Sequence, residues 1–217
     1  MKRFVLTHSC RFTLVISFLL GLQLSFSLSA SVFAADEIVQ SLLERRNVNV
    51  IRQNFDISCG AAALATILRY QHGEAVTERE VALGLIDRTE YLQRPELVRI
   101  RQGFSLLDLK RYAEIRGYQG VGFGHLTLPD LVNNAPIIVP INPVGYNHFV
   151  VFRGVMRNRV LLADPAYGNR TMTIAQFKNA WIDFANIGRV GFVVQRRDGL
   201  IPPNRLAPKA GEFSTFQ

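Results

Sequence analysis

The chain has 217 residues, 48% of them hydrophobic, which suits one domain with a substantial core. Its formal net charge of +8 is moderate and does not by itself indicate a nucleic-acid or membrane-surface partner. Two cysteines and scattered histidines form no ligand cluster with zinc spacing, so we predict neither a metal site nor another cofactor.

The first residues have the organisation of a secretory signal peptide. Basic residues at positions 2, 3 and 11 precede an apolar run over 12–28, and small residues around Ala34 suit signal peptidase. Cleavage after Ala34 removes three basic residues and no acidic one, which leaves 183 residues with a net charge of +5. An uncleaved membrane anchor is the alternative, because the apolar run approaches spanning length. We predict a signal peptide at 1–34 and a periplasmic protein without a stable membrane span after cleavage.

Helices are predicted first along the mature chain, and mainly strands after them. Capping boxes, small apolar runs and terminating glycines predict the helices, at 36–46, 58–70, 77–86, 105–116, 129–132 and 173–181. Runs rich in Val, Ile and Phe predict the strands, at 118–123, 136–141, 148–155, 159–163 and 189–195. Residues 88–104 are predicted to form a loop. This order is typical of an α+β domain with an antiparallel sheet, which we place at 35–197. Residues 198–217, polar and proline-containing, are predicted to form a flexible tail.

Signal cleavage removes Cys10 and leaves Cys59 as the single cysteine. A lone thiol in an oxidising compartment suggests a reactive or intermolecular role, and an inert buried thiol is the alternative. Cys59 is also expected where a buried helix begins. Unpaired backbone N–H groups and the positive end of the helix dipole favour a thiolate there, so Cys59 is a candidate nucleophile.

A thiolate nucleophile needs a neighbouring imidazole, and His148 is the best-placed histidine. His72 lies more than three turns along the helix from Cys59, which is too far to reach the thiol. His148 is the first residue of the apolar strand 148–155, so its side chain can project from the end of the sheet. A hairpin centred on Met156 would set Asp164 opposite His148, where the carboxylate could fix the histidine tautomer. Taken singly, a strand-end histidine and a turn-forming aspartate are ordinary alternatives.

Gln53 is the fourth candidate site residue, because it lies six positions before Cys59 on the segment that leads into the helix. Its amide could donate to the oxyanion that forms when a thiolate attacks a carbonyl group, with the backbone N–H of Cys59 as second donor. An exposed polar residue is the alternative.

Three segments resemble the motifs of C39 cysteine peptidases, in the same order along the chain. The segment 53–65 is similar to the nucleophile motif, 147–151 to the histidine motif and 163–165 to the aspartate motif. The resemblance implies a papain-like α+β fold with Cys59, His148, Asp164 and Gln53 in the site. Well-known members are fused to ABC transporters and cut leader peptides after Gly-Gly, whereas we expect this chain to be free-standing and to carry a signal peptide. It most resembles the C39-like peptidases of functional-amyloid (Fap) export systems.

The resemblance implies an exported cysteine endopeptidase that hydrolyses a peptide bond in a secreted or periplasmic protein. The expected partner is a protein or peptide substrate, such as an exported amyloid-type protein or a secretion component. A catalytically silent C39-like module that only binds a substrate for export is one alternative. Acyl transfer by the same site is another, because fold and site do not determine the acceptor.

Overall fold

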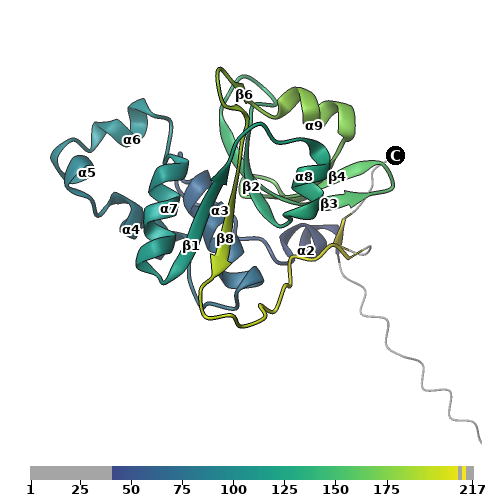
Figure 1. Cartoon of the computed structure of the whole chain (residues 1–217), viewed down its shortest axis with the longest axis horizontal. Helices are drawn as coiled ribbons and strands as arrows, with labels where there is room; N and C mark the ends of the chain where they lie inside the picture. The colour runs from purple at the N-terminus through teal and green to yellow at the C-terminus, as the bar shows by residue number, and fades with distance from the viewer. Residues whose placement is uncertain (1–40, 210–211, 214–217) are drawn as a thin grey trace, which may run out of the picture. The chain divides into compact units, whose positions relative to one another are not determined.

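The computed structural model describes residues 41–209 and 212–213, which form an α+β fold (Figure 1). The predicted signal peptide and the first residues of the expected helix 36–46 lie outside the described range. The rest of that helix is α2 (Leu42–Asn47), which begins after Ser41 with a capping box completed by Glu44. Within the described range, no helix is both long and apolar enough to cross a membrane.

The helix at the centre of the fold is α3 (Cys59–Thr66), which continues as a π-helix, η1 (Ile67–Gln71). Every residue of α3 is buried, as its small, uncharged sequence predicts. The chain leaves this helix at Gly73, whose φ of +80° favours glycine. Helix α4 (Glu78–Ile86) begins at its predicted capping box, and α7 (Leu106–Ile115) begins after its predicted cap, Ser105, which the structure shows to form a capping box with Asp108.

The predicted loop at 88–104 is wrong, because this segment contains two short helices, α5 (Thr89–Gln93) and α6 (Glu96–Ile100). Tyr91 explains the difference. Its ring is fully buried and its hydroxyl donates to Asp108 at 2.6 Å, so a tertiary contact orders a polar stretch that lacks an apolar periodicity.

The sheet has six strands in the order β1-β8-β2-β3-β4-β5, and all neighbours are antiparallel. Its strands are β1 (Tyr118–Phe123), β2 (Ile137–Ile141), β3 (His148–Met156), β4 (Arg159–Asp164), β5 (Gly168–Thr173) and β8 (Gly191–Arg196). A separate small sheet pairs β6 (Asp183–Phe184) with β7 (Gly188–Arg189). Strand β5 was not predicted, because an edge strand with the sequence GNRTMT has no apolar run to mark it.

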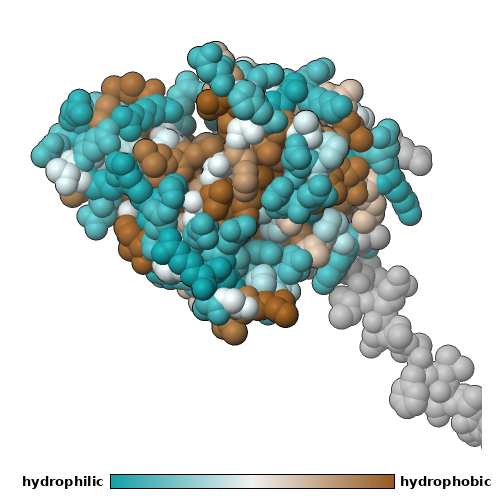
Figure 2. All heavy atoms as spheres, viewed as in Figure 1, coloured by the Kyte–Doolittle hydropathy of each residue, from teal (hydrophilic) through white to brown (hydrophobic). Residues whose placement is uncertain are grey.

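Helices cover both faces of the six-stranded sheet (Figure 1). On one face α3 packs against the sheet in a core cluster that contains Leu64 and Val151. Helix α7 packs against β1, and α4 packs against α3 and α7 on the same helical side (Figure 1). On the other face α8 (Leu128–Asn133) and α9 (Ile174–Ala180) cover a second core cluster that contains Phe152 and Phe177. Figure 2 shows apolar residues gathered in the middle of the visible face, with mostly hydrophilic residues and smaller apolar groups around them.

The hairpin of β3 and β4 differs in register from the one predicted. Its turn is the pair Arg157–Asn158, both with positive φ, and Met156 pairs with Arg159. A bulge between Phe152 and Gly154 inserts Arg153 as an extra residue, after which Val151 pairs with Ala163. Extending that register sets Asp164 opposite Val150. The predicted pairing of Asp164 with His148 is therefore wrong by two residues, although both side chains lie on the same side of the hairpin.

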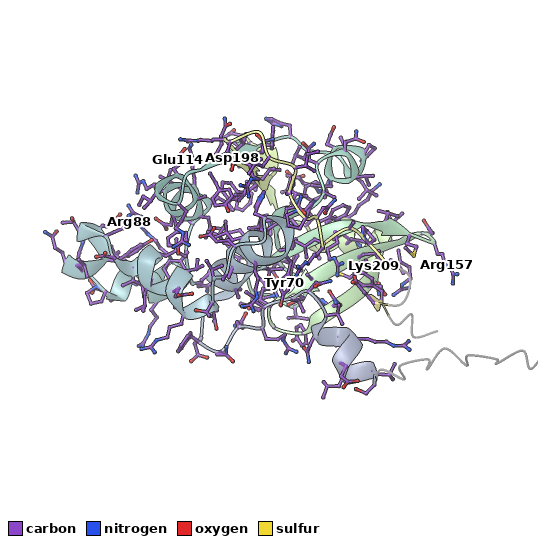
Figure 3. All side chains as sticks on the ribbon, turned by 90° about the horizontal axis from the view of Figure 1, so that it is seen from below. Tyr70, Arg88, Glu114, Arg157, Asp198 and Lys209 are labelled. Atoms are coloured by element: carbon purple, nitrogen blue, oxygen red, sulfur yellow. The ribbon has the colours of Figure 1, made fainter. Side chains whose placement is uncertain are left out.

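The described part of the C-terminal segment packs against the domain instead of standing apart from it. Leu206 is fully buried in the core, and Arg205 N–H donates to the carbonyl of Tyr70 at 2.8 Å. Arg153, the bulge residue, is buried and ion-pairs with Glu212. In Figure 3 Lys209 lies beside the hairpin whose tip carries Arg157. The last described residues are thus part of the folded core.

Candidate active site

Cys59 is the first residue of α3, as predicted, and only 3% of its surface is exposed. The helix brings it to the end of the sheet at which β3 begins. There the backbone N–H of Phe149 donates to the Cys59 Sγ at 3.5 Å. The nucleophile candidate therefore lies directly beside His148, the residue that precedes Phe149 in the chain.

His148 and Asp164 form a buried pair at this end of the hairpin. The His148 Nε2 lies 2.7 Å from Asp164 Oδ1, and the two side chains are 1% and 0% exposed. Asp164 Oδ1 also accepts the backbone N–H of Ala166 at 2.8 Å, and Arg170 Nε lies 2.7 Å from Asp164 Oδ2. These contacts hold the carboxylate in place and orient the imidazole.

The surroundings of the pair determine its charge state. Burial alone would lower the pKa of His148, but hydrogen bonds to Asp164 and Cys59 outweigh burial and raise it to about 9. Burial would raise the pKa of Asp164, but the hydrogen bond and charge of His148 and the charge of Arg170 hold it below its ordinary value. At neutral pH the site therefore contains an imidazolium and a carboxylate.

Tyr146 contacts the other side of the imidazole. Its hydroxyl lies 2.8 Å from His148 Nδ1, and the two ring centroids are 5.5 Å apart. Tyr146 belongs to the loop 142–147 between β2 and β3, which Asn142 closes by donating to the side chain of Asn147 at 3.0 Å. Burial, then the charges of Cys59 and Asp164, raise the pKa of Tyr146 to about 12. The phenol is therefore neutral at physiological pH.

Gln53 lies close to this site through its backbone. Its N–H donates to the carbonyl of Pro165 at 2.9 Å, directly beside Asp164. Its side-chain Nε2 has only a 3.5 Å contact with the carbonyl of Phe55, a distance at the limit for a hydrogen bond. Its Oε1 is buried and has no hydrogen-bond partner among the described residues. The amide thus remains available to another group.

The loop between Gln53 and Cys59 is held by Glu78, the first residue of α4. The Glu78 carboxylate is buried and accepts the backbone N–H of Asn54 at 2.9 Å and the Ser58 hydroxyl at 2.5 Å. Ile57 in this loop has φ of +58°, an unfavourable conformation for a β-branched residue. Glu78 is therefore well placed to keep a strained loop in the geometry that presents Cys59.

The same loop forms one wall of an apolar cavity of about 410 Å³. Phe55 and Ile57 contribute from the loop, Leu83 and Ile86 from α4, and Phe104 from the segment before α7. An apolar cavity beside the candidate nucleophile is suited to apolar side chains of a bound chain.

The structure thus brings together Cys59, His148 and Asp164, and places the Gln53 backbone beside them. Sequence reasoning missed Tyr146, Glu78 and Arg170. Glu78 was counted only as part of the 77–80 capping box, and Arg170 lies on the unpredicted β5. Tyr146 carries a weak signal in its position two residues before His148. In the described part of the chain, no three His, Cys, Asp or Glu side chains are grouped as a metal site.

Comparison with known proteins gives matches over most of the domain. Residues 47–186 match the peptidase C39 family. A protein of Pseudomonas aeruginosa named "Probable functional amyloid protease FapD" is 39% identical over 153 residues, which are 70% of this chain and 66% of that protein. A protein of Pseudomonas fluorescens with the same name is 40% identical over 176 residues, 79% of this chain and 74% of the relative. The match thus spans just under two thirds of the first relative.

A crystal structure gives an independent comparison of the fold. It is described as a double glycine motif protease from an AMS/PCAT transporter in complex with the leader peptide. The two structures superpose with a TM-score of 0.53 at 23% identity, over 68% of this chain and 90% of the other. This likeness confirms the predicted α+β fold of the C39 type.

Proposed function

This chain belongs to the peptidase C39 family, and we propose that it is an exported endopeptidase whose nucleophile is Cys59. The predicted family is confirmed by the family match, and the two relatives named as probable functional amyloid proteases support the predicted cysteine peptidase activity. The observation that carries the site assignment is the buried contact of 2.7 Å between His148 and Asp164 beside the first residue of α3.

The reaction follows from the positions of these groups. The Cys59 thiolate attacks the peptide carbonyl carbon, a C–S bond forms, and the carbonyl electron pair moves onto oxygen. The backbone N–H of Cys59 and the Gln53 amide stabilise this oxyanion. When the C–N bond breaks, His148 gives its Nδ1 proton to the leaving nitrogen. Water then adds to the thioester and passes a proton to Nδ1, and the C–S bond breaks to release the carboxylic acid and the thiolate.

We infer the location and the substrate from the signal-like N-terminus and from the relatives. The chain is secreted into the periplasm after cleavage near Ala34, and its substrate is an exported protein of the functional-amyloid type, as the names of the relatives suggest. N-terminal sequencing of protein purified from a periplasmic fraction tests the first part. An intact N-terminus in a membrane fraction would overturn it in favour of an anchored protein.

Intact-mass spectrometry tests the activity. The mature chain is incubated with an exported amyloid-type protein, beside Cys59→Ala and His148→Ala. We expect new fragments with the wild type, none with Cys59→Ala, and a rate roughly 10² to 10⁴ lower with His148→Ala. Stable binding without cleavage by the wild type would favour the silent binding module. A product heavier than the hydrolysis fragments, by the mass of an amine acceptor, would indicate acyl transfer.

A further inference from the structure

The His148 imidazole makes a hydrogen bond at each of its two nitrogens. Nε2 is paired with Asp164, so Nδ1 is the nitrogen left to serve the thiol and the leaving amine. In this structure Nδ1 is 2.8 Å from the hydroxyl of Tyr146. A single N–H points well at only one acceptor at a time. Whatever holds Nδ1 therefore competes with Cys59 for the imidazolium proton.

The position of Cys59 agrees with this competition. Its Sγ accepts a hydrogen bond from the backbone N–H of Phe149. Among the described residues Nδ1 makes its well-directed hydrogen bond with Tyr146 and not with Sγ, although Cys59 is close enough for a weaker hydrogen bond and its charge to contribute to the raised pKa of His148. The thiol and the imidazole are thus neighbours, but the imidazole is aligned with Tyr146.

We propose that Tyr146 is a positioning residue that holds the His148 Nδ1 proton in the resting site, and that a bound substrate must displace its hydroxyl before the proton can be transferred. This inference rests on the proposed Cys59–His148 pair. The neutral phenol oxygen accepts the Nδ1 proton at rest. Displacement needs only a movement of the side chain or of the loop 142–147, where Gly145 has φ of +86° and Val144 is 78% exposed.

Tyr167 provides a matched control for Tyr146. It is a second tyrosine near the site, 57% exposed, and its ring stacks against Arg170 with the guanidinium carbon 5.1 Å from the ring centroid. Its hydroxyl makes no hydrogen bond to another side chain in the described part of the chain. The ionisable groups that act on His148, Asp164 and Tyr146 are otherwise Cys59 on α3, Arg170 on β5 and, weakly, Tyr167 itself. Cys59, Asp164 and Arg170 remain in both variants.

The experiment is the pH dependence of Cys59 alkylation by iodoacetamide, without substrate, for the wild type, Tyr146→Phe, Tyr167→Phe and His148→Ala. Removal of one hydrogen bond that competes for Nδ1 should increase labelling of Tyr146→Phe at pH 5–6 by roughly two- to tenfold. The rising limb of its profile should move to lower pH by up to about one unit, while Tyr167→Phe follows the wild type. An unchanged or upward-shifted limb in a folded Tyr146→Phe would overturn the proposal.

The other variants separate this proposal from the proposed function. If His148→Ala labels as fast as the wild type at pH 5–6, the Cys59–His148 pair itself is refuted. If His148→Ala labels slowly and Tyr146→Phe behaves as the wild type, only the role of Tyr146 is refuted. Should Tyr146→Phe not fold, the ¹⁵N resonance of His148 Nδ1 decides. It should stay in place in Cys59→Ala if Tyr146 is the partner and move if the thiol is.

Discussion

At the scale of single residues, the chemistry of the candidate site depends on burial and on hydrogen bonds, which shift the pKa values of its side chains. The closeness of Cys59, His148 and Asp164 could be predicted from the sequence. A lone cysteine at the start of a helix, a histidine at the start of a strand and an aspartate after the next strand have the order of the C39 motifs. Tyr146 was not predictable, because its role depends on where a loop places its hydroxyl. Nothing in the sequence around position 146 specifies that distance.

The charge of His148 leads to a pH prediction for stability. Its folded-state pKa of about 9 lies above the ordinary value of about 6.5, so the folded protein holds the proton more tightly. The resulting contribution to the free energy of unfolding is fully present below about pH 6.5 and is lost as the pH rises through 9. Urea unfolding from pH 6 to 9.5 should therefore show falling stability.

His148→Gln is the comparison for this experiment, because it removes the titrating group and keeps a polar side chain of similar size. We expect a flatter dependence of stability on pH for this variant across the same range. If the free energy of unfolding falls equally steeply with pH in the wild type and in His148→Gln, a group other than His148 causes the loss of stability.

At the scale of elements, capping boxes were the most reliable signals. Helices α4 and α7 begin at Glu78 and Leu106, as their capping residues Thr77 and Ser105 predict. The segments that were missed, α5, α6 and β5, are ordered by tertiary contacts of polar sequences. Tyr91 buried against Asp108 and the pairing of β5 with β4 are invisible to a local pattern.

Helix α4 also yields a prediction, because its first residue holds the loop before Cys59. Glu78→Ala leaves the donors of Asn54 and Ser58 without their acceptor, which should cost about 1–3 kcal/mol of stability. The displaced loop should lower peptidase turnover by roughly 10²-fold, because small displacements of reacting groups have such effects.

Glu80→Ala is the matched control on the same helix. Glu80 completes the exposed capping box with Thr77, so its loss should lower stability by up to about 1 kcal/mol and leave turnover intact. Thermal unfolding and turnover of a peptide substrate measure both effects. Equal turnover of the two variants at a temperature where both are folded would contradict a positioning role for Glu78.

At the scale of the whole molecule, the C-terminal segment packs over the buried guanidinium of Arg153. Arg153 ion-pairs with Glu212 and donates to the carbonyl of Leu206 at 2.8 Å, and Asn169 accepts from its guanidinium at 3.1 Å. A polar, proline-containing sequence predicted a flexible tail here. The C-terminal segment is held by Arg153, which lies inside the apolar strand β3, 53 residues before Leu206 and 59 residues before Glu212. No local sequence pattern connects positions so far apart.

Substitution of this arginine should destabilise the whole domain. Arg153→Met leaves Glu212 buried without its partner, which should cost about 3–5 kcal/mol. Lys110→Met is the control, because the Lys110–Glu114 pair on α7 is partly exposed and should contribute less than about 1 kcal/mol. Urea unfolding at pH 7 measures both. Similar losses in the two variants would show that the C-terminal segment does not depend on Arg153.

The bulge at Arg153 affects which codon deletions the gene can tolerate. Side chains alternate between the two sides of a strand, so one extra residue decides which side every later residue occupies. An in-frame deletion of the Arg153 codon, however, would remove only the extra residue, so Phe152 would still pair with Leu162 and Asp164 would stay on the same side of the hairpin as His148. Selection should therefore keep this codon for the buried ion pair of Arg153 with Glu212, and not for the register of the histidine and the aspartate.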